Sequence, residues 1–330
     1  MDGPQRETQP NGRPARGEPF GHQPVMVDQV VALFAPVPPG WVVDATVGGG
    51  GHARALLDAH AHLSLLGIDR DADAVAAATT ALAGFGERAR VRPARFDHLA
   101  DSVERAGARP VSGVLFDLGV SSPQVDRPER GFSYRVDAPL DMRMDRTQPL
   151  TAADIVNTYD EDALADVLRR YGDERHARRI ARAVVAARPV TTTGELVEIV
   201  RDAIPAPARR RGGHPAKRTF QAVRIEVNAE LDVLPPALGQ AIDVLQPGGR
   251  CAVLAYHSGE DRIVKDRFRH AATGGCTCPA RLPCVCGARP VVRLLQRGTR
   301  PSAEETAANP RAGSARLRAV EKLPVDGAAA

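Results

Sequence analysis

The sequence predicts an α/β fold in which a mostly parallel sheet is covered by helices and interrupted by a helical insertion. First, residues 41–52 read as a strand ending at Asp44, a tight glycine turn and the start of a helix. Second, apolar strand-like runs alternate with helical runs as far as about residue 125. Third, this alternation stops at residue 126 and returns after residue 215.

The glycine turn predicts a nucleotide-type ligand. A ligand that lies against the turn must meet backbone rather than Cβ atoms, and such a turn often requires a positive φ. The glycines at 48–51 precede an Ala/Leu-rich run at 53–61, which predicts a helix. An earlier helical pattern at 22–34 ends at Pro36, Pro38 and Pro39 and is expected to pack beside the first strand.

Three strands of this half are expected to end in acids. Asp44 ends the first strand, Asp69 follows the run at 63–68, and Asp117 ends the run at 111–117. A third strand at 91–96 would end at Phe96, after a helix at 72–83, and its ring is either stacked on an adenine or part of the core. Because the carboxyl ends of parallel strands line one crevice, the three acids are expected to face one ligand.

The pattern around the glycines leaves three types of turn open. Gly48-x-Gly50-x-x-Ala53 fits the loose dinucleotide fingerprint, and Asp69 lies about twenty residues on, where an acid binds ribose hydroxyls. Asp44 before the glycines would repel a pyrophosphate and favours a cofactor with a cationic amino-acid end. Asp44-x-x-x-Gly48-Gly49-Gly50 resembles motif I of S-adenosylmethionine-dependent methyltransferases. A purely structural glycine turn is the third alternative.

The remaining elements complete a seven-stranded sheet around the insertion. Helical patterns at 152–159, 161–171, 174–187 and 194–204 form the insertion, and Thr219 to Val244 is helical with a break at Pro235-Pro236. A turn at 247–249 precedes strands at 250–256, 291–296 and 315–320, with a helix at 302–308. The expected domains are a disordered tail (1–20), the first part of the core (21–125), a helical, substrate-recognising insertion (126–214), the second part of the core (215–320) and a tail (321–330).

Composition restricts the class of protein. The hydrophobic share of 43% and charged share of 25% are ordinary for a soluble protein. No apolar run predicts a membrane span or a signal peptide, so the protein is expected in the cytoplasm. The net charge of +4 requires any nucleic-acid contact to come from local patches. Residues 201–224 carry seven Lys/Arg against one acid, and residues 169–182 carry six Arg against two acids; each patch is either an RNA-binding surface or a solvated face. The RNA-binding candidates are Arg210, Arg211, Lys217, Arg218 and Arg224.

Four cysteines form a second candidate site. Cys276, Cys278, Cys284 and Cys286 stand as two Cys-x-Cys pairs separated by five residues, among turn-forming Gly and Pro. In the cytoplasm a tetrathiolate zinc site is the alternative to a metal-free loop, because disulfides are rare there. The spacing is shorter than that of common zinc motifs. Cys251, within a predicted strand, is expected in the core.

Five segments resemble a known family in one order along the chain. They are DLGVSSPQ (117–124), RGFS (130–133), DMRMD (141–145), HPAKRTFQAVRI (214–225) and HSGEDR (257–262). Through residues 21–320 the chain resembles the bacterial ribosomal RNA small subunit methyltransferase H family, also called MraW. The resemblance implies a class I S-adenosylmethionine-dependent methyltransferase with a Rossmann-like seven-stranded sheet, and an activity that methylates N4 of a cytidine in the decoding region of 16S ribosomal RNA.

The resemblance also assigns residues and a partner. The cofactor S-adenosyl-L-methionine would be bound by Gly50, Gly51, His52, Asp69, Phe96, Asp117 and Gln124. The group that orients the cytosine amine is open between Asp117, Ser121 and Ser122. The partner would be the small ribosomal subunit, and the oligomeric state is open between monomer and homodimer. An NAD-dependent oxidoreductase and a non-catalytic RNA-binding module are the competing hypotheses.

Overall fold

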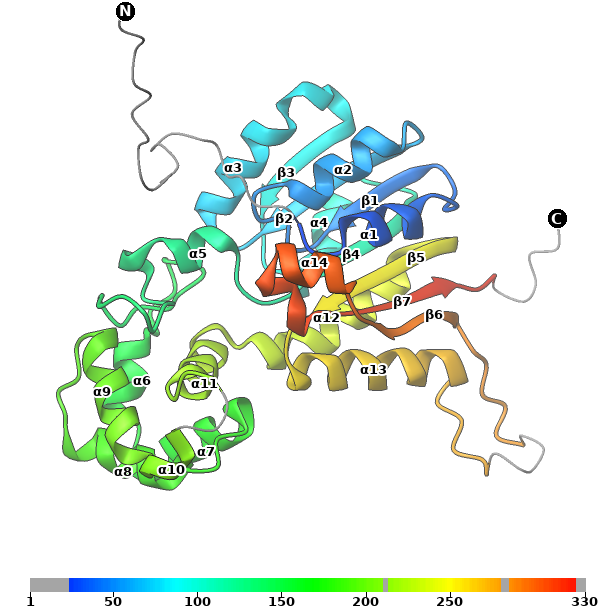
Figure 1. The fold of residues 1–330 in the computed structure, drawn as a ribbon. Coiled ribbons are helices and arrows are strands. Elements are labelled where there is room, and N and C mark those ends of the chain that lie inside the picture. The colour runs from blue at the N-terminus through cyan, green and yellow to red at the C-terminus, as the bar shows by residue number, and fades with distance from the viewer. Residues whose placement is uncertain (1–23, 210–212, 280–284, 325–330) are drawn as a thin grey trace, which may run out of the picture.

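The computed structural model describes residues 24–209, 213–279 and 285–324. Its centre is one seven-stranded sheet in the order β3-β2-β1-β4-β5-β7-β6, with β7 antiparallel to both neighbours and β1 to β5 parallel (Figure 1). This confirms the predicted class I methyltransferase sheet. The strands are β1 (Gly40–Asp44), β2 (Leu63–Asp69), β3 (Ala89–Pro93), β4 (Val111–Asp117), β5 (Leu245–Ala255), β6 (Val292–Thr299) and β7 (Arg316–Lys322).

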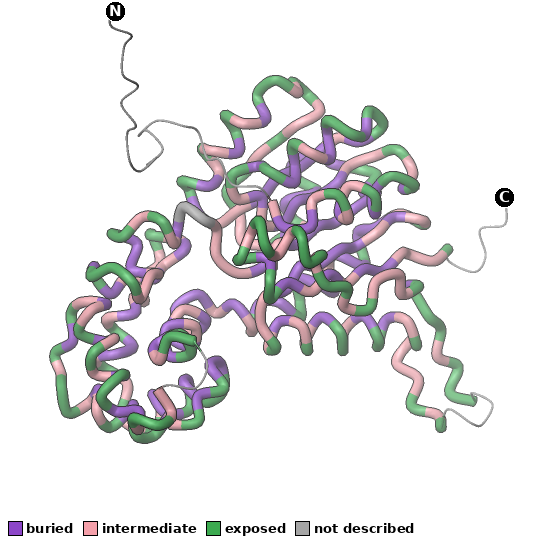
Figure 2. Tube along the Cα trace, viewed as in Figure 1, coloured by how far each residue is buried: buried purple, intermediate pink, exposed green. Residues whose placement is uncertain are grey.

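Helices cover both faces of the sheet because neighbouring residues of each strand point to opposite sides. The Val42 side chain packs against the helices that directly precede and follow β1 in the chain. The next side chain, Val43, points to the opposite face of the sheet and packs against the helices there. Figure 2 shows buried positions along the strands and along the inner sides of these helices. One face carries α1 (Val27–Phe34), α2 (Gly51–Ala59) and α3 (Ala72–Leu82), and the other carries α4 (Leu99–Ala106), α12 (Glu230–Val244) and α13 (Ser258–Thr273).

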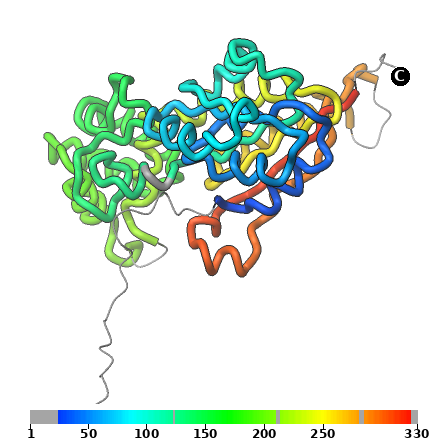
Figure 3. The backbone as a smooth tube through the Cα atoms, turned by 90° about the horizontal axis from the view of Figure 1, so that it is seen from above, coloured from blue at the N-terminus to red at the C-terminus, as the bar shows by residue number. Residues whose placement is uncertain are grey.

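A helical region lies beside the sheet and has its own core (Figures 1 and 3). The core includes Tyr171, Ile180, Val200 and Phe220, so the last helix before α12 packs with the insertion. The predicted domain boundary at residue 214 would separate this helix from the core in which it packs. The division into domains stays a proposal, and we count this helix with the insertion. The helices are α6 (Ala152–Thr158), α7 (Glu161–Gly172), α8 (Ala177–Ala186), α9 (Thr193–Ala203), α10 (Ala206–Arg209) and α11 (Lys217–Asn228).

Among the described residues, no helix is long and apolar enough to cross a membrane. The predicted N-terminal tail lies outside the described residues. The predicted C-terminal tail was to begin at residue 321, but β7 continues to Lys322.

Short elements connect the layers of the fold. The short elements are α5 (Ser122–Asp126), α14 (Ala303–Ala308) and the 3-10 turns η1 (Ala83–Arg88), η2 (Phe96–His98), η3 (Pro128–Arg130) and η4 (Pro310–Ser314).

The predicted end of the third strand and the predicted start of the fifth are wrong, and β6 and β7 extend beyond their predicted ends, to Thr299 and Lys322. The third strand ends at Pro93 and not at Phe96. Ala94 still donates to the Asp69 carbonyl at 2.9 Å, and Phe96 begins η2. The predicted turn at 247–249 lies within β5 as a bulge, since Val111 pairs with Leu245 while Gly113 pairs with Arg250.

The predicted helix break at Pro235-Pro236 is also wrong. Both prolines lie inside α12, and the chain breaks at Ala229, whose φ of 50° separates α11 from α12. The prolines are tolerated although each removes a helical hydrogen bond. Leu234 and Leu238, on either side of them, are fully buried against the sheet, so packing favours the continuous helix.

Candidate functional site

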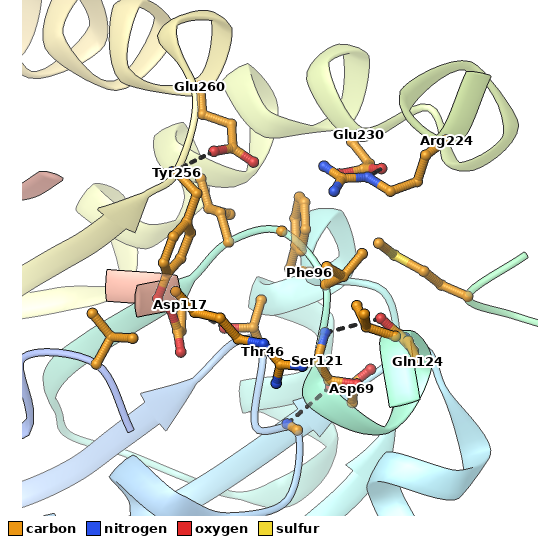
Figure 4. A pocket seen from close by; sticks show the side chains of 18 of the residues that line it. Thr46, Asp69, Phe96, Asp117, Ser121, Gln124, Arg224, Glu230, Tyr256 and Glu260 are labelled. Carbon is orange, nitrogen blue, oxygen red and sulfur yellow. Dashed lines mark hydrogen bonds and ion pairs between the residues drawn. The ribbon is translucent and has the colours of Figure 1, made fainter. Parts of the chain in front are cut away.

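A cavity of about 550 Å³ opens at the carboxyl ends of β1, β2, β4 and β5. The strand order reverses between β1 and β4, which is where open α/β sheets bind ligands. Its walls come from the glycine turn, the segment after β4, the start of α13 and, across the opening, α11 and α12 (Figure 4). The lining includes Gly51, His52, Asp69, Phe96, Asp117, Ser121 and Gln124 from the predicted residues.

Asp69 fixes the conformation of the glycine turn. Its Oδ2 accepts a hydrogen bond from the Gly48 N–H at 3.0 Å, and its Oδ1 accepts from the Asp71 N–H at 2.9 Å. Burial raises the pKa of Asp69 to about 6 despite these two donors. Since each carboxylate oxygen has a second lone pair, Asp69 can still accept from the hydroxyls of a bound ribose.

The glycines leave room for a ligand. Gly50 caps α2 with a φ of 84°, a conformation that residues with a Cβ rarely adopt. It does not line the cavity. Gly49 does line it, and no atom lies within 4 Å of the place where a Cβ would stand. The backbone is therefore open to a ligand at Gly49, one residue before the predicted contact.

Asp117 joins three elements around the cavity. Its Oδ1 accepts a hydrogen bond from the Tyr256 hydroxyl at 2.6 Å, and its Oδ2 lies 3.5 Å from Nδ1 of His52. The His52 ring reaches the Val25 carbonyl through Nε2 at 2.9 Å, so that nitrogen carries a proton and Nδ1 faces the carboxylate. Burial raises the pKa of Asp117 even though both partners favour the ionised form. Asp117 is thus a rigidly held acceptor with strengthened basicity.

Tyr256 was not among the predicted site residues. It directly follows β5, so its position at a strand end was the available signal. The Glu260 carboxylate accepts from the N–H groups of Tyr256 and His257 at 2.8 and 3.2 Å. Burial opposes the charge of Glu260, but His257 and Arg224 lower its pKa overall. This buried carboxylate holds the backbone of Tyr256 in place (Figure 4).

Asp44 does not reach the crevice that was predicted to receive it. It is 2% exposed and does not line the cavity, whereas Asp69 and Asp117 do. Burial raises its pKa to about 8, and the charges of Asp117 and Asp69 add to this rise against the Thr46 N–H that lowers it. Because a carboxyl group with this pKa is mostly neutral at pH 7, Asp44 supplies little charge to a ligand.

Gln124 lines the cavity, but its side-chain amide is engaged within the protein. Its Oε1 accepts from the Ser121 N–H at 3.0 Å, and its Nε2 donates to Oδ2 of Asp71 at 2.8 Å. Asp71 also forms a buried ion pair with Arg130 at 2.8 Å. Gln124 therefore positions the loop around Ser121. The side chain of Ser122 lies outside the described residues.

Phe96 packs at the edge of the core. Its ring meets that of Phe116 edge to face, with centroids 5.8 Å apart, and one side of it lines the cavity. The two alternatives for this residue are thus compatible. It belongs to the core and still presents a surface to a flat ligand.

The opposite wall carries the described basic candidates. Lys217 and Arg224 line the cavity from α11, but Arg224 forms a two-bond ion pair with Glu230 at 2.8 and 2.9 Å. Lys217 is exposed, and its side-chain ammonium makes no hydrogen bond or ion pair with any residue in the described ranges. Arg218 is directed elsewhere and donates to the Asp173 carbonyl. Arg210 and Arg211 lie outside the described residues.

Comparisons with known proteins match nearly the full length of the chain to one family. The model of the MraW methylase family matches residues 19–323. The ribosomal RNA small subunit methyltransferase H of Symbiobacterium thermophilum is 52% identical over 310 residues, covering 92% of this chain and 97% of the relative. The protein of the same description from Acidothermus cellulolyticus is 56% identical, with coverages of 92% and 94%. That of Thermobifida fusca is 52% identical, with coverages of 97% and 98%.

Proposed function

The chain belongs to the MraW methylase family, and from this premise we propose that it methylates N4 of a cytidine in the decoding region of 16S ribosomal RNA, with S-adenosyl-L-methionine as methyl donor. The family favours methyl transfer over the hydride transfer of an oxidoreductase. The observation that supports the proposal most is that a single cavity is lined by the glycine turn on one side and by Lys217 on the other. A cofactor and an RNA nucleotide can therefore meet in it.

The residues around the glycine turn fit S-adenosylmethionine. Asp69 has acceptor capacity for the ribose hydroxyls, the open space at Gly49 admits the ligand, and Phe96 offers a ring face to the adenine. When bound, the cofactor supplies an electrophilic methyl group on a sulfonium sulfur. His52 and Gln124 act by holding Asp117 and the Ser121 loop.

Asp117 is the proposed acceptor for the amine. The cytosine amine becomes more positive as it gains the methyl group, so a fixed carboxylate beside it stabilises that charge and takes up the proton that leaves. The raised pKa of Asp117 strengthens it as a proton acceptor. The Tyr256 hydroxyl orients this carboxylate, and Ser121 is the second polar group that can contact the amine.

The RNA is expected to approach over α11. Lys217 is a cation without an internal partner among the described residues, which suits a phosphate oxygen. Arg224 serves a different purpose, because Glu230 neutralises it and the pair shapes the wall. Since a paired cytosine hides its N4, the nucleotide has to leave its stack to reach Asp117. A ribosomal substrate also places the activity in the cytoplasm.

Methyl transfer to small ribosomal subunits that lack the modification tests the proposal. With labelled S-adenosylmethionine, the digested RNA should contain N4-methylated cytidine at one position, and Asp117→Asn should slow the transfer by about 10²- to 10⁴-fold with cofactor affinity largely kept. Sedimentation of the same mixtures reports whether a monomer or a homodimer binds the subunit. Label in another nucleotide would refute the assigned substrate. Subunit binding with no transfer would favour the non-catalytic RNA-binding module.

A further inference from the structure

Three cysteine side chains converge at the end of the molecule that lies away from the cavity. The Sγ atoms of Cys276, Cys278 and Cys286 all lie within 4.8 Å of one another. Cys276 and Cys278 are half-buried, and Cys286 is exposed. They belong to the segment that follows α13 and leads to β6, at the right of Figure 1.

The backbone at the base of this segment holds its two ends together. The Val291 N–H donates to the Ala271 carbonyl at 3.0 Å, so the chain returns beside the end of α13. Gly274 has a φ of 62°, and the place of its missing Cβ lies only 2.3 Å from the Arg289 carbonyl oxygen. No other residue fits there without displacing that backbone. The two ends are thus fixed close together, and the thiols lie just beyond them.

Apolar packing of the described residues does not explain why the three thiol groups lie close together. Val285 is 89% exposed and Val291 is 43% exposed, so these two described apolar side chains of the segment lie in solvent instead of forming a core. Thiol groups have little attraction for one another, and their ionised forms repel. A cation that binds sulfur would turn this repulsion into a stable arrangement.

We propose that Cys276, Cys278 and Cys286 bind one zinc ion as thiolates. Bonds of about 2.3 Å in a tetrahedral site put the sulfurs about 3.8 Å apart, so a cluster already within 4.8 Å needs only a small contraction. Each thiol that ligates the ion loses its proton to solvent. A further ligand completes the fourth position; Cys284, the fourth cysteine of the sequence pattern, lies outside the described residues.

The ion has a structural role. α13 has 16 residues, and at 1.5 Å per residue its two ends are roughly 24 Å apart. Its first turn contributes Glu260 to the cavity wall, whereas the thiols follow its last turn. Zinc would stabilise the segment after Gly274 and take no part in methyl transfer. The inference is independent of the proposed function.

Metal analysis of the full chain tests the site. Protein purified without chelator should contain about one zinc per chain, and Cys278→Ser and Cys286→Ser should each lower zinc affinity by more than the roughly 10- to 100-fold typical of outer-shell changes. Thr277→Ala is the matched control, because it changes the same segment without removing a thiol, and should keep its zinc. All variants should bind S-adenosylmethionine like the parent chain, which shows that they fold.

Alkylation of the parent chain gives a second readout that needs no variant. The cluster thiols should react slowly until a chelator removes zinc, and cobalt substitution should give the charge-transfer absorption of thiolate ligands. Zinc far below one equivalent after reduction and reloading, with thiols that react at once, would overturn the proposal. Stoichiometric iron with visible colour would overturn it in favour of an iron–sulfur cluster.

Discussion

Replacing Arg130 with methionine should destabilise the loop that closes one side of the cavity. Arg130 is 3% exposed and forms a 2.8 Å ion pair with Asp71, which is itself buried. The same guanidinium donates to the carbonyls of Arg143 and Met144, at the start of the helical region. Arg130→Met keeps the apolar volume but leaves the Asp71 charge buried, with Gln124 and the Asp73 N–H as its remaining donors among the described residues.

Breaking a buried ion pair from one side costs about 3–5 kcal/mol. The remaining donors to Asp71 place the expected loss of unfolding free energy at the lower end of this range, about 3 kcal/mol. For a chain of 330 residues, an unfolding entropy of about 2.1 cal/mol/K per residue gives about 0.7 kcal/mol per degree. The melting temperature should therefore fall by about 4 °C.

Thermal unfolding followed by circular dichroism measures this loss. Arg127→Met is the matched control, since Arg127 pairs with Asp73 in solvent and such pairs contribute about 0–1 kcal/mol. Asp71→Asn combined with Arg130→Met removes the stranded charge and should recover most of the stability. If Arg130→Met lowered the melting temperature no more than Arg127→Met does, the buried pair would not stabilise this loop.

Three further predictions concern the cavity. Asp69 has a pKa of about 6 and is mostly ionised above that pH. Because the ionised carboxylate is the better acceptor for ribose hydroxyls, cofactor affinity measured by calorimetry should rise with pH up to about 6 and then level. Asp69→Asn should weaken cofactor binding by about 1.5–3 kcal/mol and remove most of this pH dependence. Tyr256→Phe removes the donor to Asp117 and should slow methyl transfer more than it weakens cofactor binding; equal effects on both would contradict an orienting role. Lys217→Ala should reduce the salt slope of subunit binding by about 1, whereas Arg218→Ala, whose side chain bonds to a carbonyl, serves as the comparison; identical slopes would mean that Lys217 is only solvated.

The sheet and the glycine turn could be predicted because their signals are local. A buried strand followed by glycines and a helical run is written in about a dozen neighbouring residues, and Asp69 and Asp117 are strand ends in the sequence itself. The parallel architecture then brings these ends to one edge. The same reasoning was wrong for Asp44. Its side chain accepts from the Thr46 N–H and is buried, so it does not reach the cavity although it stands at a strand end.

The cavity wall opposite the glycine turn depended on tertiary structure. Arg224 was predicted to contact RNA from its place in a basic run, but the break at Ala229 brings Glu230 to it and neutralises its charge. No proline or glycine stands next to that break in the sequence, so no local signal predicted it. Its position follows from the packing of α11 in the helical region and of α12 against the sheet.

By itself, then, the sequence determined the sheet and the two carboxylates that line the cavity, since both follow from patterns between near neighbours in the chain. The class of ligand came from the resemblance of five segments to one family and not from the glycine turn alone. Only the tertiary structure decided how those carboxylates are held. Asp117 and Tyr256 are 139 residues apart and meet because β4 and β5 pair side by side. A contact over that separation depends on strand order and packing, and neither is written in the residues around either partner.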